Sequence, residues 1–107
     1  MKNEKIKETL IEVVQNLSAG NYLNVYNNDL NKRLSINDMK RAINEYKGII
    51  NLPPLIAYDK FYDYDNEYSE ENFIEFNLWF DGEESDLTLS VTIYEKGGYS
   101  IEDIRVL

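Results

Sequence analysis

Two consecutive prolines, Pro53 and Pro54, divide this chain of 107 residues into halves with different periodicity. Neither proline can donate a backbone hydrogen bond, and each disfavours helix in the residue before it, so no helix continues through them. Before the pair, apolar residues recur about every 3.6 residues, and from Leu55 onward they alternate. The sequence therefore predicts one α+β domain over residues 1–107, with a helical part (1–52) followed by an antiparallel sheet (55–107).

The helical part contains two clear amphipathic patterns. The first covers residues 6–17, with Lys, Glu and Gln on its polar face. Ser35 and Asp38 form an acidic variant of the capping box, which predicts a second helix that starts at Ser35 and ends near Gly48. The intervening residues 21–33 are rich in Asn, which favours turns, and we expect a short irregular helix and a loop there.

The second half is typical of β-hairpins. Residues 72–80 and 87–94 alternate between apolar and polar side chains, as expected for strands that bury one face. The turn sequences Asp81-Gly82 and Lys96-Gly97-Gly98 flank such strands, which indicates two hairpins.

Two further strands complete the predicted sheet. The last strand covers residues 99–107, and its apolar phase slips, which indicates a bulge near Glu102-Asp103. Residues 56–64 are expected to form another strand. The result is a curved antiparallel meander of about four strands with the helices covering one face.

The charge is concentrated in the sheet half. The formal net charge is −9, yet residues 1–54 carry 8 basic and 6 acidic side chains. Residues 55–95 carry 12 acidic side chains and a single basic one, Lys60. Such a surface would repel phosphates, so we expect neither a nucleic-acid partner nor an anionic membrane.

The absence of Cys and His restricts the chemistry further. It excludes disulfides, thiol catalysis, His/Cys metal sites and the usual base at neutral pH. No signal peptide and no apolar run long enough to span a membrane are present, so we expect a cytoplasmic protein. The sequence predicts no cofactor and no enzymatic activity.

Aromatic and acidic residues interleave between positions 59 and 71. One interpretation is a solvated strand end and loop, as is usual for runs of charge. The other is a recognition surface for a basic protein, because Tyr supplies rigid contact area and carboxylates pair with Arg or Lys. The candidate partner-binding residues are Asp59, Tyr62, Asp63, Tyr64, Asp65, Glu67, Tyr68, Glu70 and Glu71.

The spacing Asp63-x-Asp65-x-Glu67 is similar to the start of a calcium loop, but the sequence does not complete that motif. An EF-hand needs Gly at its sixth position and Glu at its twelfth, where this chain has Tyr68 and Ile74. We therefore expect no metal site.

The layout of N-terminal helices and a bulged meander resembles NTF2-like or cystatin-like α+β folds. The stretch Asp86-Leu87-Thr88-Leu89-Ser90-Val91-Thr92, followed by residues 97–107 (GGYSIEDIRVL), resembles the ending of a family of small uncharacterised bacterial proteins. In that setting small acidic proteins look like immunity proteins or antitoxins, so the resemblance implies a protein-binding role and defines no site residues.

Charge and resemblance together favour a non-enzymatic immunity protein or antitoxin that neutralises a cationic toxin, such as a nuclease. The alternative is an NTF2-like pocket protein, or an isomerase- or hydratase-like enzyme, with a small ligand between helices and sheet near Trp79, Phe76 and Tyr94. A homodimer formed through the open sheet face is compatible with either function.

Overall fold

The chain forms helices first and a sheet second. The computed structural model describes residues 3–107, which form the helices α1 (Asn3–Ser18), α2 (Tyr22–Asn28) and α3 (Ile36–Glu45). The long strands β3 (Glu71–Phe80), β4 (Glu83–Tyr94) and β5 (Tyr99–Val106) follow. The short strands β1 (Ile50–Asn51) and β2 (Tyr62–Asp63) both pair with β3, which gives an open, five-stranded antiparallel sheet. Four strands follow the order β1-β3-β4-β5, and β2 lies off this path against β3. The predicted α+β fold is confirmed.

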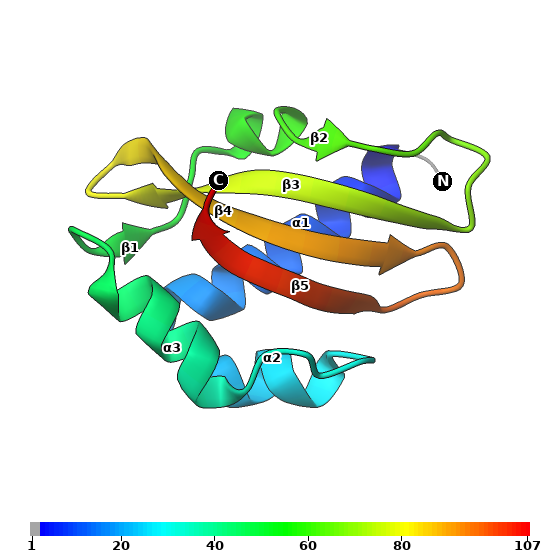
Figure 1. Cartoon of the computed structure of the whole chain (residues 1–107). Coiled ribbons are helices and arrows are strands. Elements are labelled where there is room, and N and C mark those ends of the chain that lie inside the picture. Colours follow the sequence, from blue (N-terminus) through cyan, green and yellow to red (C-terminus); the bar gives the residue numbers. More distant parts are fainter. Residues whose placement is uncertain (1–2) are drawn as a thin grey trace.

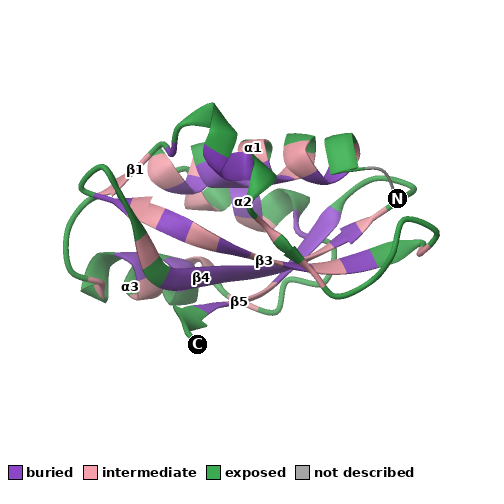
Figure 2. Cartoon of the chain, turned by 90° about the horizontal axis from the view of Figure 1, so that it is seen from above, coloured by how far each residue is buried: buried purple, intermediate pink, exposed green. Residues whose placement is uncertain are grey.

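Helix α1 lies across one face of the sheet, and α2 and α3 lie beside the β5 edge (Figure 1). Alternate residues of β3 point toward α1 and are buried, from Asn72 to Phe80. They meet the apolar stripe of α1, which includes Leu10, Val13 and Leu17. Figure 2 shows the buried positions along the central strands and on the side of α1 that faces them. Helices and sheet therefore share one core.

Helix α3 begins with the predicted capping box. The Ser35 hydroxyl accepts a hydrogen bond from the Asp38 N–H, and the Asp38 carboxylate accepts one from the Ser35 N–H, both at 3.0 Å. The helix ends at Glu45, earlier than predicted, because Tyr46 becomes extended and its ring packs 4.6 Å from that of Phe80. The predicted short helix within residues 21–33 is α2.

The β3–β4 hairpin contains an irregularity that the sequence did not reveal. Its turn, Asp81-Gly82, has positive φ at both residues, as a two-residue hairpin turn requires. Trp79 pairs with Glu84, whereas Asn77 pairs with Thr88, so β4 has two extra residues between these pairs. This bulge shifts the pairing of β3 with β4 by two residues from Asn77 back to Glu71.

The predicted bulge in the last strand is confirmed. Ser90 pairs with Asp103 and Val91 pairs with Ile101, which leaves Glu102 as the extra residue of β5. Both predicted hairpins are present, and β5 covers almost all of the expected residues.

The predicted strand over residues 56–64 is wrong for most of its length. Leu55–Asp59 form a 3-10 helix, η1, and only Tyr62 and Asp63 form a strand. Pro54 is the N-cap of η1, with extended backbone, and its carbonyl accepts a hydrogen bond from the Ala57 N–H at 2.9 Å. The turn buries Tyr58, whose ring stacks 5.4 Å from that of Phe76. Strand β1 was also missed, because it falls in the segment assigned to the helical part.

Candidate binding surface at the end of the sheet

The nine predicted partner-binding residues differ in their local surroundings. They extend from the end of η1, through β2 and the loop after it, to the first residue of β3. The structure divides them into carboxylates held by internal partners, tyrosines on the open sheet face, and residues at the end of the sheet.

Asp59, Asp63 and Asp65 have internal partners. Asp59 forms an ion pair with Lys7 of α1 at 2.5 Å. Asp63 accepts hydrogen bonds from the Asn72 side-chain amide at 2.9 and 3.0 Å, and Asp65 accepts one from the Phe73 N–H at 2.8 Å. These acids hold η1 and the loop before β3 in place, which is a structural role that the sequence interpretation did not assign to them.

Two of the predicted tyrosines lie together on the open face of the sheet. The rings of Tyr62 and Tyr64 are 4.6 Å apart, and both side chains are exposed. The Tyr64 hydroxyl donates a hydrogen bond to Glu75 at 2.5 Å. That bond favours the protonated phenol and raises the pKa of Tyr64 above its ordinary value. Beside them a hollow of roughly 430 Å³ contains Lys60, Glu75 and Asn77 in its wall.

The remaining acids meet at the end of the sheet where β3 begins and β4 ends. The Glu95 N–H donates to the Glu70 carbonyl at 2.8 Å, and Glu71 pairs with Tyr94. A hollow of roughly 490 Å³ opens there, which we call the acidic hollow. Its wall is formed by Leu30, Asn31, Glu70, Glu71, Tyr94, Glu95 and Lys96. Glu67 and Tyr68 are exposed in the loop that leads to it.

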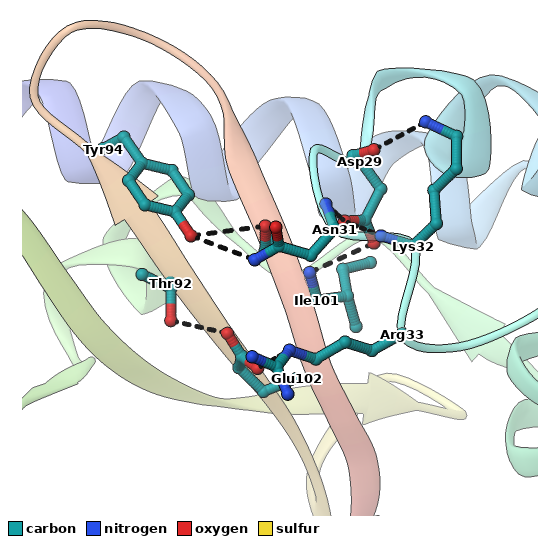
Figure 3. A network of polar contacts seen from close by, with 9 residues as sticks. Asp29, Asn31, Lys32, Arg33, Thr92, Tyr94, Ile101 and Glu102 are labelled. Carbon is teal, nitrogen blue, oxygen red and sulfur yellow. Dashed lines mark hydrogen bonds and ion pairs between the residues drawn. The ribbon is translucent and has the colours of Figure 1, made fainter.

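The far wall of the acidic hollow is built by the connection between α2 and α3. Asp29 in this connection is buried, and its carboxylate accepts hydrogen bonds from the N–H groups of Asn31, Lys32 and Ile101 (Figure 3). The Leu30 N–H donates to the Tyr99 carbonyl at 2.9 Å, which extends the contact with β5.

Asn31 fixes the tyrosine of the acidic hollow. Its side-chain amide donates a hydrogen bond to the Tyr94 hydroxyl at 3.2 Å, and that hydroxyl lies 3.4 Å from Ser100 Oγ (Figure 3). Tyr94 is partly buried and its hydroxyl has two hydrogen-bond partners, so it offers a preorganised ring beside Glu70, Glu71 and Glu95. Such a ring loses little entropy on binding a partner.

Charges inside the acidic hollow are not balanced. Within residues 3–107, no ion pair involves the carboxylates of Glu70, Glu71 or Glu95, and Lys96 is the one basic residue in the wall. The described residues also contain no group of three or more acidic side chains placed to hold one metal ion.

The residues expected to line a ligand pocket between helices and sheet lie on two different faces. Phe76 is buried in the core against Tyr58, whereas Trp79 and Tyr94 point to the face without α1. Apolar side chains of α1 and the sheet fill the space between these two layers. The expected lining of Trp79, Phe76 and Tyr94 is therefore wrong.

Comparison with known protein families assigns the chain to a family. The model of a family described as "Domain of unknown function (DUF7668)" matches residues 14–107, which include α2, α3 and the complete sheet. The chain belongs to the DUF7668 family. The expectation of an uncharacterised family of small domains is thus confirmed, while the bacterial source and the immunity role stay predictions. No curated protein and no solved structure matches this DUF7668 protein.

No helix in the described part of the DUF7668 chain is long and apolar enough to cross a membrane.

Sequence reasoning missed Glu95, Leu30 and Asn31 as neighbours of Glu70 and Glu71. With a regular hairpin extended from the Asp81-Gly82 turn, Glu71 would pair two positions earlier on β4, and Glu95 would face Tyr68 in the loop before β3 instead of Glu70. The one available signal was the extra polar pair Ser85-Asp86 before the alternation of β4. Ser85 closes the bulge, since its hydroxyl donates to the Leu78 carbonyl at 2.6 Å.

Proposed function

We propose that this DUF7668 protein is a non-enzymatic binding module that recognises a basic protein through the acidic hollow and the exposed tyrosines of β2 and the loop after it. In the most specific form of this proposal, the protein is a cytoplasmic immunity protein or antitoxin that covers the cationic surface of a bacterial toxin, such as a nuclease. The observation that carries the proposal is the group Glu70, Glu71 and Glu95, which is arranged around the fixed ring of Tyr94 and has no internal ion pair among the described residues.

The charge of the surface supports a basic partner. Residues 55–95 carry 12 acidic side chains against one basic, and the chain as a whole has a net charge of −9. A field of this sign accelerates encounter with a cationic protein and makes binding strongly dependent on salt. The tyrosines Tyr62, Tyr64 and Tyr68 are all exposed and would supply contact area around the charges.

The internal partners of Asp59, Asp63 and Asp65 narrow the proposed surface. Because these carboxylates hold η1 and the loop before β3, the residues expected to contact the partner are Glu70, Glu71 and Glu95 with the exposed tyrosines. Asp63 and Asp65 would contribute through the shape of the loop.

The test begins with a tagged full-length protein used to capture a partner from lysate of the source organism at low and moderate salt. The affinity of the purified partner is then measured by titration calorimetry for the wild type and for Glu70→Gln/Glu71→Gln/Glu95→Gln. A control of equal charge change, Glu4→Gln/Glu8→Gln/Glu45→Gln, alters exposed helical acids instead.

The triple variant of the hollow is expected to bind roughly tenfold more weakly and with a smaller salt dependence, because it loses three surface charge pairs. The helical control is expected to change affinity less than about twofold. Equal effects of the two variants would contradict the proposed surface, and a partner without basic character would contradict the proposed function.

A further inference from the structure

A second exposed feature lies away from the acidic hollow and has the opposite character. Four large apolar side chains in the segment after α3 and at the start of η1 are 56% to 76% exposed, namely Ile49, Leu52, Leu55 and Ile56, which we call the neutral strip. No charged residue occurs from Gly48 to Tyr58, although charged residues make up 29% of the chain. An exposed apolar group of this kind marks an interaction site more often than a scattered surface residue does.

The neutral strip runs along the outer edge of the sheet and then along α1. Asn51 pairs with Trp79 at the β3 edge, while Asp59 at the end of η1 forms an ion pair with Lys7 in α1. Asn51 and Leu52 lie beside the last turn of α1, whereas Asp59 lies beside an early turn of the same helix. The chain from Asn51 to Asp59 therefore runs antiparallel to α1.

A hollow accompanies the exposed side chains. It has a volume of roughly 340 Å³, and its wall is formed by Gln15 and Ser18 of α1, Ala19 directly after the helix, and Asn51 and Leu52. None of these residues is charged, and the Ser18 hydroxyl is buried without a hydrogen-bond partner. The same surface thus contains a neutral hollow and, next along the chain, the protruding side chains of Leu55 and Ile56.

We infer that the neutral strip is the contact surface for a second copy of this chain. A two-fold symmetric interface uses one patch twice, so it requires a surface that is complementary to itself. A hollow beside protruding apolar side chains meets this requirement, since Leu55 and Ile56 of each copy can enter the hollow of the other.

The charge distribution allows a second copy to approach at the neutral strip. Two chains with a charge of −9 each repel one another, and the repulsion is weakest where each presents an uncharged surface. A basic protein would be attracted to the acidic hollow instead, and an anionic membrane would repel the chain. The inference does not depend on the proposed function, because the two surfaces share no residue.

Salt separates the two interactions experimentally. Higher ionic strength screens the repulsion between two acidic copies and strengthens apolar burial, so it should favour the dimer. The same change should weaken a complex of the acidic hollow with a basic partner. Sedimentation velocity of the full chain is therefore measured across protein concentration at low and at high NaCl, where the monomer has a mass of 12.6 kDa.

The variants are Leu55→Ser/Ile56→Ser in the neutral strip and Val106→Ser/Leu107→Ser as the matched control at the end of β5. All four side chains are at least half exposed, so neither variant removes core packing, and circular dichroism verifies the fold. We expect the wild type and the control to reach twice the monomer mass as concentration and salt increase, and the strip variant to stay at the monomer mass.

Three outcomes would overturn the inference. One is a wild type that stays monomeric at millimolar concentration and high salt. Another is a dimer that the strip variant leaves unchanged and the control disrupts. The third is a monomer that binds neutral phosphatidylcholine vesicles through Leu55 and Ile56, which would assign the strip to a lipid surface.

Discussion

The Asp29 carboxylate accepts a hydrogen bond from the backbone N–H of Ile101 at 3.2 Å, across 72 positions of sequence. Its other oxygen accepts bonds from the N–H groups of Asn31 and Lys32, both at 3.1 Å. One buried side chain therefore satisfies three backbone donors and joins the α2–α3 connection to the β5 strand. The wall of the acidic hollow depends on this junction.

Asp29→Asn should destabilise the fold although it conserves shape. An amide has one acceptor oxygen, so its NH₂ group would face either the Ile101 N–H or the pair from Asn31 and Lys32. Leaving a buried donor unsatisfied costs about 1–3 kcal/mol, and urea unfolding should show a loss of that size. Glu8→Gln, the same change from acid to amide at an exposed position of α1, is the control, and equal stability of Asp29→Asn and wild type would refute the role of the carboxylate.

Gly98→Ala should be more destabilising than Gly97→Ala. Both glycines have positive φ, at 95° and 110°, so alanine is strained at either position. At Gly98 an added Cβ would also lie 2.9 Å from Leu30 Cδ1, whereas nothing lies within 4 Å of a Cβ at Gly97. We expect a loss of about 1 kcal/mol for Gly97→Ala and a larger one for Gly98→Ala, measured by thermal unfolding. Equal losses would show that Leu30 moves aside without cost.

The stability should decrease at alkaline pH, in part through Tyr99. Burial, followed by the nearby charges of Glu12 and Asp29, raises the pKa of Tyr99 from 10.0 to about 12. A raised folded-state pKa means that the folded protein holds the Tyr99 proton more tightly than the unfolded chain does. The contribution of Tyr99 to the free energy of unfolding is therefore complete below pH 10 and is lost as the pH rises toward 12.

Tyr99→Phe isolates this contribution. The variant loses the hydrogen bond from the Tyr99 hydroxyl to the Val25 carbonyl, which should cost about 1 kcal/mol at pH 7. Because Phe cannot ionise, its disadvantage relative to wild type should shrink between pH 9 and pH 11, as followed by urea unfolding at each pH. A constant difference in unfolding free energy between wild type and Tyr99→Phe over this pH range would contradict the raised pKa of Tyr99.

Asp63→Ala should loosen the loop that leads to the acidic hollow. It removes the partner of the buried Asn72 amide, which would keep its bond to the Asn66 carbonyl at 3.2 Å alone. We expect a loss of about 1–2 kcal/mol and faster hydrogen exchange of backbone amides in residues 64–70. Glu83→Ala, an exposed acid at the other end of the sheet, should change neither quantity. Unchanged exchange in the Asp63 variant would show that the loop is held by other contacts.

The order of the elements was predictable because it depends on local patterns. Pro53-Pro54 separates the helices from the long strands, and the alternation of β3 matches its burial residue by residue. The Ser35–Asp38 capping box and the bulge at Glu102 were also predictable, since each involves neighbours a few positions apart. The failure at residues 56–64 has the same origin, because the burial of Tyr58 against Phe76 is a long-range contact that alternation does not reveal.

The candidate site depended on tertiary structure for a different reason. Composition determined that the sheet half is acidic, but it could not distinguish Asp59 and Asp63, which have internal partners, from Glu70 and Glu71, which line the hollow. The bulge at Ser85-Asp86 shifts the register of β4 by two residues and so brings Glu95 beside Glu70. Periodicity is a local property of the chain, whereas register and side-chain pairing are set by contacts between distant segments, and only the fold decides them.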